Sequence, residues 1–328
     1  MAKKGRKEGI SMFCKSVLEA IGNTPVVKLS RLCREWELEG QLFAKLENLN
    51  PGYSKKDRIA LKIIEEAEAS GALSPGQPVV ELTSGNTGTG LAIVCAVKGY
   101  PFIAVMSKGN SMERARMMEA LGAEVVLVDQ APGSVPGQVS GEDLALVEAK
   151  TQEVVKELGA FRADQFMLEA NAKAHELHTG EELWHDLDGQ IDAFVDFVGT
   201  GGTFVGCAKA LKKHNPDIRC YLVEPASAPY LAGGPIKNPN HKIQGGGYCR
   251  DLPLLDRSLV EEYITVTDEE AIEGARALAE IEGIFGGFST GAHVFAAARL
   301  LRGKEKGNTI AFLVCDSGLK YLSTDLYV

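Results

Sequence analysis

The sequence predicts an α/β fold with parallel sheets, from the alternation of its segments, from one buried strand and from its length. Short apolar runs alternate with segments of helical periodicity along most of the chain, which is typical of parallel sheets. Residues 193–198, Ala-Phe-Val-Asp-Phe-Val, form a nearly continuous apolar run, as expected for a strand covered on both faces. The 328 residues, 45% of them hydrophobic, are enough for a large core and for two domains.

The first half of the chain leads from a tail into a series of strand–helix units. Residues 1–13 are expected to be a flexible arm, and the segment from Val17 to Leu29 a turn that feeds a short strand. From Lys56 the apolar residues recur at helical spacing, and this helix is expected to stop before Gly71. The other predicted elements are strands at 42–47, 79–82, 102–106 and 124–128 and helices from near 86, at 112–121 and at 142–158.

The second half repeats this alternation after an expected exposed loop at 131–141, which is rich in glycine and proline. The predicted strands are 193–198, 220–224 and 310–314, and the predicted helices are 172–187, 204–213, 268–282 and 292–302.

Composition excludes several classes of protein. The formal net charge of −9 argues against a nucleic-acid surface, which needs a basic face. No window approaches the roughly 18 apolar residues of a membrane span. The basic start at residues 1–7 lacks the apolar run of a signal peptide, so a solvated tail is favoured over a targeting arm. The seven cysteines are scattered and form no Cys-x-x-Cys pair, which indicates a reduced, cytoplasmic chain with Cys95 and Cys315 as small core residues.

The loop Gly199-Thr200-Gly201-Gly202-Thr203 follows the buried strand and opens a helix, a favourable place for an anion. A dinucleotide-binding fingerprint would need glycine at Phe204, and no Gly-Lys-Ser/Thr follows, so a single phosphate fits better than a dinucleotide. A tight strand–helix turn without a ligand stays open.

A second loop, Thr83 to Gly88, is richer in side-chain donors. Thr83, Ser84, Gly85 and Thr87 could bind a carboxylate through hydroxyls and exposed amides, and Asn86 could donate to a phenolate-type oxygen. The alternative is a cluster of helix-capping residues, since Ser, Asn and Thr all cap helices.

Lys56 is one of two adjacent lysines at the predicted start of a helix. The helix dipole there disfavours a positive charge, which lowers the pKa of the amine and helps it act as a nucleophile or base. The alternative is that Lys55 and Lys56 are both solvated surface residues.

These loops occur together with further motifs: Ser54-x-Lys56-Asp-Arg58, Ile21-Gly-Asn-Thr-Pro25, Gly287-Phe-Ser-Thr-Gly291 and Asp316 to Thr324. The set resembles the cysteine synthase and cystathionine β-synthase family of enzymes that use pyridoxal 5'-phosphate (PLP). The resemblance runs from about Ser16 to Thr324, nearly the whole chain.

The resemblance implies fold type II, tryptophan synthase β-like, with two parallel-sheet α/β domains and PLP in the cleft between them. A large domain of residues 14–53 and 161–328 and a small mobile domain of residues 54–160 are expected. In this family the lysine of the Ser-x-Lys-Asp-Arg motif binds PLP covalently, which implies Lys56 and leaves Lys55 at a variable position.

The other implied roles follow the remaining motifs. The glycine-rich loop 199–203 holds the phosphate, Asn86 contacts the cofactor ring, and Ser289 faces the pyridine nitrogen. A neutral hydroxyl there leaves the ring a weaker electron sink than an aspartate would, which favours loss of a β-substituent.

The chain departs from the family where substrate is chosen. Gln165 is retained and is implied to contact the substrate carboxylate, but Leu168 and Glu169 replace an Asn-Pro pair. Tyr248, Arg250 and Asp251 bring bulk and charge after the His241-Lys-Ile-Gln-Gly245 motif, where the family is small and neutral, and residues 131–141 look like an insertion.

The implied reaction is β-replacement on a serine- or cysteine-type amino acid by sulfide or a thiol, with cysteine synthase first and a homodimer expected. The alternatives are a cysteine β-lyase or hydroxyl-lyase that releases hydrogen sulfide, in which Asp251 or Tyr248 activates water or a thiol, and thiol addition as in cystathionine β-synthase. Those two side chains could equally point to solvent.

Two other classes of protein find no support in the sequence. An oxidoreductase would need the missing dinucleotide fingerprint, and an inactive scaffold protein would lack the lysine. His175 and His178 are one residue short of the His-Glu-x-x-His zinc spacing, so no metal is expected.

Overall fold

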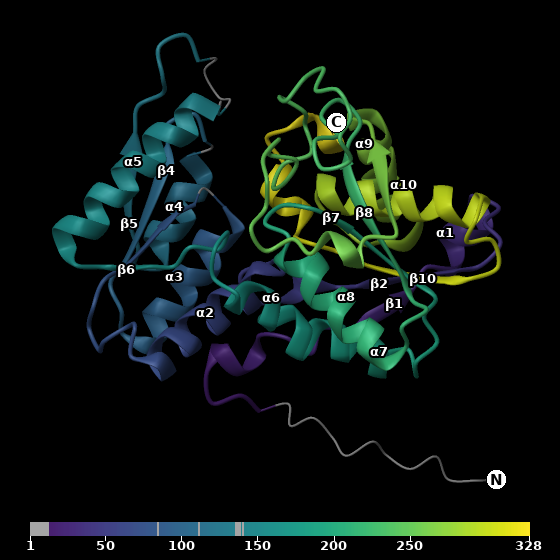
Figure 1. Ribbon diagram of the computed structural model, residues 1–328, viewed down its shortest axis with the longest axis horizontal. Helices are drawn as coiled ribbons and strands as arrows, with labels where there is room; N and C mark the ends of the chain where they lie inside the picture. Colours follow the sequence, from purple (N-terminus) through teal and green to yellow (C-terminus); the bar gives the residue numbers. More distant parts are fainter. Residues whose placement is uncertain (1–12, 84, 111, 135–138, 140) are drawn as a thin grey trace.

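The protein folds into two α/β lobes, each built around its own sheet (Figure 1). The structure is a computed structural model and describes residues 13–328 except 84, 111, 135–138 and 140. In this part of the chain a six-stranded sheet has the order β1-β2-β10-β7-β8-β9, and a four-stranded sheet has the order β5-β4-β3-β6. The predicted two-domain α/β architecture is therefore confirmed.

Almost all of the strands match apolar runs of the sequence. The larger sheet contains β1 (Val26–Lys28), β2 (Gln41–Lys45), β7 (Ala193–Phe197), β8 (Arg219–Pro225), β9 (Glu262–Val266) and β10 (Thr309–Leu313). The smaller sheet contains β3 (Val79–Leu82), β4 (Phe102–Ser107), β5 (Glu124–Val128) and β6 (Phe161–Arg162). Neither β6 nor β9 is predicted from the sequence. Strand β6 has only two residues, and β9 is a half-buried edge strand without a continuous apolar run.

The pairing is parallel throughout except for β1, which runs antiparallel to β2. Parallel strands place their carboxyl ends at one edge of the sheet, where ligands bind in open α/β folds. In the larger sheet this edge carries Val198 after β7 and Val314 after β10.

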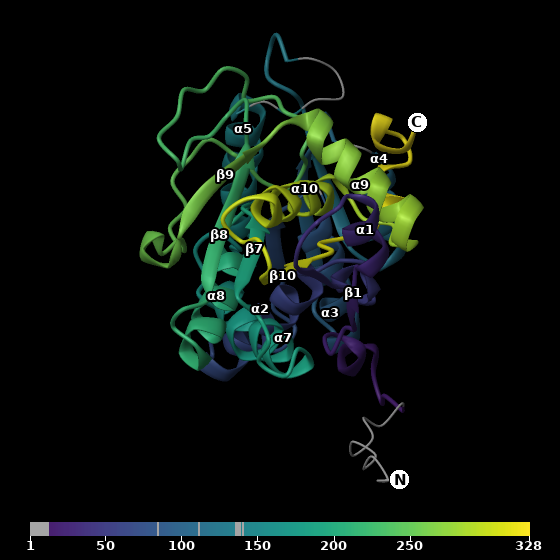
Figure 2. The same ribbon diagram turned by 90° about the vertical axis from the view of Figure 1, so that its right-hand side faces the viewer.

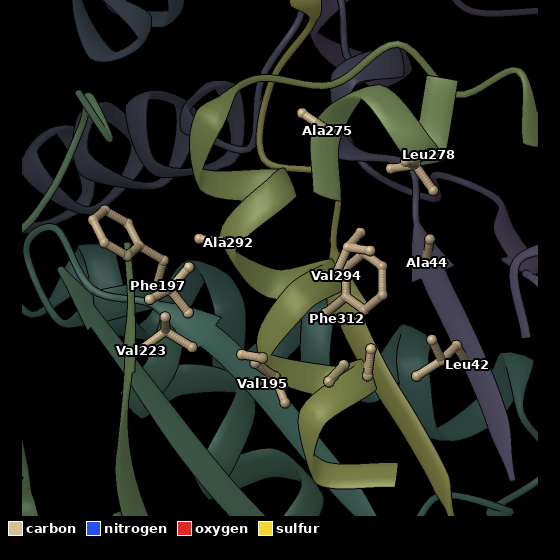
Figure 3. Packing of buried hydrophobic residues seen from close by; sticks show 14 of the residues in the cluster. Leu42, Ala44, Val195, Phe197, Val223, Ala275, Leu278, Ala292, Val294 and Phe312 are labelled. Carbon is tan, nitrogen blue, oxygen red and sulfur yellow. The ribbon is translucent and has the colours of Figure 1, made fainter. Parts of the chain in front are cut away.

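Helices cover both faces of the larger sheet (Figures 1 and 2). One face packs against α9 (Asp268–Glu282), α10 (Phe288–Arg302) and α1 (Ser30–Glu35), and the other against α7 (Glu181–Asp186) and α8 (Gly202–His214). Figure 3 shows the first of these cores, in which α9 and α10 contribute Ala275, Leu278, Ala292 and Val294, and the sheet contributes Leu42, Ala44, Val195, Phe197, Val223 and Phe312.

The smaller sheet is also covered on both faces. Its helices are α2 (Lys56–Ser70), α3 (Asn86–Lys98), α4 (Met112–Ala120) and α5 (Gly141–Leu158). Helix α5 packs against β3 and β4, while α2, α3 and α4 share a second core with residues of the opposite face. At the junction of the lobes, α2 packs against α6 (Ala170–Ala174) (Figure 1).

The predicted boundary after residue 160 needs one correction. Phe161 and Arg162 pair with Val79 and Val80 of β3, so β6 belongs to the smaller sheet, although the predicted division assigns it to the large domain. The other boundaries stay predictions, and residues 1–12 of the predicted arm lie outside the described residues.

The helix predicted at 172–187 is interrupted by a π-helical segment, His175–Gly180, between α6 and α7. The reason is close packing against α8. A Cβ at Gly206 would lie 2.2 Å from the Ala172 carbonyl oxygen, and one at Gly180 would lie 2.5 Å from Ala210 Cβ. Short single-turn π segments are frequent at functional sites.

Other details follow the sequence closely. Helix α2 ends at Ser70 because Gly71 takes the left-handed conformation at φ +76°. Helix α10 begins at Phe288, four residues before its predicted start. All seven cysteines lie in the described part and are free, with Cys95 and Cys315 buried as predicted. None of the described helices is long and apolar enough to cross a membrane.

Candidate active site

Helix α2 places Lys56 at the edge where β10 ends. Ser54 pairs with Asp316 as an isolated β-bridge, and the Lys55 N–H donates to the Cys315 carbonyl at 2.8 Å. The Ser54 hydroxyl then accepts from the Lys56 N–H at 3.2 Å, which starts the helix. The segment that carries both lysines is therefore fixed to the larger sheet although α2 itself belongs to the smaller lobe.

Arg58 ties the same turn of α2 to the larger lobe. Its guanidinium donates to both carboxylate oxygens of Glu47 at 2.7 Å and to Glu182 at 2.6 and 2.7 Å. Burial opposes ionisation of Glu47, but the charge and hydrogen bonds of Arg58 outweigh it and lower the pKa of Glu47. Bidentate pairs of this kind fix geometry as well as charge.

The Lys56 amine is partly buried, and its Nζ has no hydrogen-bond or ion-pair partner among the described residues. Burial, followed by the positive charge of Lys55, lowers the pKa of Lys56 to about 7. A lowered pKa of Lys56 was expected from the helix dipole, and here it follows from burial and from the charge of Lys55. A large part of the amine is consequently neutral near pH 7, as a nucleophile or base requires.

The loop 199–203 is shaped so that only glycine fits at several positions. Gly201 has φ +88°, and a Cβ at Gly199 would lie 2.4 Å from the Gly245 carbonyl oxygen. Gly201 to Thr203 are buried at the start of α8, whose first N–H groups have no acceptor within the helix. Buried donors of this kind need an acceptor, so the loop is suited to an anion such as phosphate.

Side chains behind this loop support it, and sequence reasoning missed them. Asn171 Nδ2 donates to Thr200 Oγ1 at 2.8 Å and to the Gln165 carbonyl at 2.7 Å. His175, from the π-helical segment, lies 3.2 Å from Thr203 Oγ1. Burial lowers the pKa of His175 well below its ordinary value, so it is a neutral support. The sequence signal for His175 was a polar side chain inside the predicted helix 172–187, and Asn171 directly precedes that helix.

The loop after β3 meets the substrate residue predicted from the other lobe. Thr87 Oγ1 donates to Gln165 Oε1 at 2.7 Å, which leaves Gln165 Nε2 to donate elsewhere. Thr83 Oγ1 accepts from the Gly88 N–H, in the first turn of α3, at 2.9 Å. Gly85 is the N-cap residue of α3 and uses no side chain. The predicted Ser84 lies outside the described residues.

Asn86, the first residue of α3, is held by the segment after β10. Its amide donates to Asp316 Oδ2 at 2.7 Å and accepts from Lys320 Nζ at 2.5 Å. Tyr321 also donates to Asp316 Oδ2, at 2.6 Å. One N–H of the Asn86 amide remains for a ligand. The motif from Asp316 to Thr324 therefore orients the side chain that is predicted to contact the cofactor ring.

Ser289 is the second residue of α10 and is buried beside Cys315. The Cys315 N–H donates to Thr290 Oγ1, on the next residue of α10, at 3.1 Å. Burial raises the pKa of Cys315 to about 11, so this thiol is neutral. The sequence interpretation of Cys315 as a small core residue missed its position next to Ser289 and Lys55.

Tyr248, Arg250 and Asp251, which depart from the family, are all exposed. Tyr248 and Arg250 both pack on Phe166, the neighbour of Gln165, with ring centroids 5.9 Å apart and the Arg250 guanidinium 5.0 Å from the ring. The Asp251 side chain is 84% exposed and lies 3.6 Å from Arg257. A role for Asp251 at the substrate therefore stays a prediction that no contact of the described residues supports.

Together these contacts join the predicted motifs. A path of hydrogen bonds runs from Thr87 through Gln165 and Asn171 to Thr200. From the other side, Lys55 Nζ lies 3.0 Å from Asp196, which is three residues before Gly199. The start of α2, the loop after β3 and the loop 199–203 are therefore linked through these contacts.

Comparison with known proteins identifies the family. Residues 17–316 match the family described as pyridoxal-phosphate dependent enzyme. The chain belongs to this family. The glycine cradle with its buried N–H groups, the neutral amine of Lys56 and the Ser289 hydroxyl fit PLP, which would be held by these groups and by Asn86.

Relatives agree with this membership. The chain is 42% identical to a cysteine synthase from Staphylococcus aureus, over 95% of this chain and 96% of the relative. An O-acetylserine sulfhydrylase, isoform 3, from Entamoeba histolytica matches with a TM-score of 0.88 and 36% identity, over 100% of this chain and 94% of that one. A hydrogen sulfide-producing enzyme from Fusobacterium nucleatum matches with a TM-score of 0.85 and 41% identity, over 94% and 100%.

The resemblance to the cysteine synthase family, the enzyme class and the PLP cofactor are thereby confirmed. The roles of individual site residues stay predictions.

Proposed function

We propose that the protein is a cysteine synthase, which replaces the β-substituent of O-acetylserine by sulfide to give cysteine and acetate. The path of hydrogen bonds from Thr87 to Thr200 carries this proposal, because it links the loop proposed to bind the substrate carboxylate with the loop proposed to bind the phosphate. The similarity to cysteine synthases over nearly the whole chain supports the same reaction.

In this proposal the chain's own groups divide the work. Bound PLP supplies an electron sink that acidifies the α-proton of the amino acid. Lys56 would hold the cofactor through its amine and, once the amino acid has displaced that amine, would take the α-proton. Gln165 Nε2, which Thr87 orients through Gln165 Oε1, and the Thr87 N–H would bind the substrate carboxylate, with Thr83, Ser84 and Gly85 as further proposed contacts. Ser289 would offer the cofactor ring a neutral hydroxyl in place of a carboxylate, which would keep the sink weak and favour loss of the β-substituent.

A second candidate is a cysteine lyase that releases hydrogen sulfide. Two observations favour considering it: the similarity to the Fusobacterium enzyme, and Tyr248 with Arg250 packed on Phe166 beside Gln165. Both side chains would crowd the space next to the substrate residue and add a charge there. Asp251 is a proposed water- or thiol-activating residue of this reaction only.

Two incubations separate these candidates. Purified protein with PLP is given O-acetylserine plus sulfide in one tube and cysteine alone in the other, with Lys56→Ala as the inactive control. We expect cysteine and acetate in the first tube at a rate well above sulfide release in the second. Sulfide release from cysteine with no reaction in the first tube would establish the lyase and reject the synthase.

We further propose that the protein is a cytoplasmic homodimer. Seven free cysteines without a disulfide suit a reducing compartment, and a dimer is the expectation from the family resemblance. Light scattering of the purified protein should give twice the mass of one chain, and the mass of a single chain would reject the dimer.

A further inference from the structure

A buried polar cluster adjoins Lys56 through its chain neighbour Lys55 and is not used by the proposed reaction. It consists of Lys55, Asp196 of β7, His293 of α10 and Cys315 after β10, which are all buried. Lys55 Nζ lies 3.0 Å from Asp196 Oδ1, and the His293 ring lies 3.5 Å from the same oxygen. A lysine and an aspartate are costly to bury unless each is paired, so their joint burial next to the catalytic lysine needs an explanation.

His293 is not the partner of Asp196. The Phe197 N–H donates to His293 Nε2 at 2.5 Å, so this nitrogen carries no proton, and Nδ1 donates to the Leu313 carbonyl at 2.8 Å. Burial lowers the pKa of His293 to about 4, which agrees with a neutral ring. The ring offers Asp196 no proton, and the 3.5 Å approach is therefore a contact and no ion pair.

The same hydrogen bonds argue against a metal ion among Asp196, His293 and Cys315, which lie within 4.8 Å of one another. Both ring nitrogens of His293 are engaged, and the Lys55 ammonium already lies beside the Asp196 carboxylate. Burial keeps the Cys315 thiol protonated. Lys55 is thus the cation that neutralises Asp196.

The geometry also separates the two lysines. Lys55 is the N-cap residue of α2 with helical backbone angles, and successive residues of a helix point about 100° apart. The titratable groups that act on the Lys56 amine are Lys55, Asp196, Glu81 and Cys315, of which the Cys315 thiol is protonated and carries no charge. Of these, Asp196 is the carboxylate that Lys55 already holds, whereas Glu81 is held by Arg162 at 2.8 Å.

We propose that Lys55 is a positioning residue: it occupies Asp196 so that this buried carboxylate does not capture the neighbouring Lys56 amine, which stays free for the cofactor. This inference rests on the proposed role of Lys56. Without Lys55, Asp196 would be a buried charge without a partner, and we expect it to pair with the adjacent Lys56, on whose amine its charge already acts. The pair would hold Lys56 charged and turned away from its reaction.

The test measures the Lys56 amine itself. The full-length chain, freed of cofactor, is reductively methylated with formaldehyde and cyanoborohydride over a pH series, and peptide mass spectrometry reads modification at Lys56. In the wild type we expect half-maximal modification near pH 7. Lys55→Met should move this midpoint upward by at least about one pH unit, with a roughly tenfold slower attachment of added PLP near pH 7.

Rescue variants distinguish positioning from general damage to the fold. Lys55→Met combined with Asp196→Leu removes both charges and should bring the midpoint back toward the wild-type value, and Lys55→Arg should keep it. Asp196→Asn should leave the midpoint low, because no carboxylate remains to capture Lys56. Lys242→Met, which breaks an exposed ion pair with Asp325, is the matched control and should change nothing.

Three results would overturn the proposal: an unchanged midpoint in a folded Lys55→Met chain, no recovery in the double variant, or an upward shift in Asp196→Asn. If Lys55→Met does not fold, the Asp196→Asn and double variants still decide it. A wild-type chain that attaches no PLP at Lys56 would instead reject the proposed function.

Discussion

The substitution Gly202→Ala tests the fit of the phosphate loop against its support. A Cβ at Gly202 would lie 2.2 Å from Oδ1 of Asn171, a fully buried side chain. Asn171 cannot yield easily, because its Nδ2 is bonded to Thr200 Oγ1 at 2.8 Å and to the Gln165 carbonyl at 2.7 Å. The added methyl group must therefore displace Asn171 or move the start of α8.

The magnitude follows from these two costs. Overpacking costs about 1–3 kcal/mol, and loss of a buried hydrogen bond about 1 kcal/mol more, so the free energy of unfolding should fall by about 2–4 kcal/mol. Since about 1.4 kcal/mol corresponds to a factor of ten, a displaced loop should raise the dissociation constant for PLP by at least about tenfold. Urea unfolding and absorbance titration with PLP measure the two quantities.

A matched control and a double variant make this prediction sharp. Gly141 starts α5 in open space, where an added Cβ would meet no atom within 4 Å, so Gly141→Ala should change stability by less than about 0.5 kcal/mol. On an Asn171→Ala background, Gly202→Ala should cost much less than in the wild type, because the clash is gone. If Gly202→Ala unfolds and binds PLP like the wild type, the loop is not packed as described.

Three further predictions concern charge. The rate of PLP attachment should rise as the pH passes through about 7 and level off above it, because only the neutral Lys56 amine reacts. Stopped-flow absorbance measures this rate. A rate that stays constant between about pH 6 and about pH 8 would contradict the prediction. Arg58→Leu leaves the Glu47 carboxylate buried without its cation and should lower the free energy of unfolding in urea by about 3–5 kcal/mol. Arg31→Leu, at an exposed position, is the control and should have little effect. The pKa of His293 is lowered to about 4, so on acidification this side chain takes up its proton in the unfolded chain before it does so in the folded one. The free energy of unfolding should therefore fall as the pH drops from about 6.5 toward 4. Between about pH 7 and about pH 5, His293→Gln should lose about 2 kcal/mol less of this free energy than the wild type.

Much of the fold could be predicted because its strands are buried on both faces and its helices carry clear end signals. The apolar runs gave β3, β4, β5, β7, β8 and β10 to within two residues, and Gly71 marked the end of α2. The π-helical segment at His175 could not be predicted, since it depends on how closely α8 approaches through Gly206, a tertiary contact. The two-residue β6 carries no periodic signal at all.

The residues of the candidate site, like the elements of the fold, could be predicted only in part. Motif residues such as Lys56, Asn86 and Thr203 could be named in advance because their chemistry is read from local spacing. Their supports, Asn171, Asp316 and Lys55, lie far away in sequence or at a variable position, and pairing across the lobes gives them their role. One signal was present: Asp196 is a single carboxylate inside an otherwise apolar buried strand, which implies a buried cation opposite it.

The most direct test asks which of the two adjacent lysines carries the cofactor. The holoenzyme is reduced with borohydride, digested, and the peptide around residues 54–58 is sequenced by tandem mass spectrometry. Burial and the charge of Lys55 lower the pKa of Lys56 to about 7, whereas Lys55 is held as an ammonium against Asp196, so the pyridoxyl group should be found on Lys56 alone. A pyridoxyl group on Lys55, or on a lysine outside this segment, would contradict the account of the site.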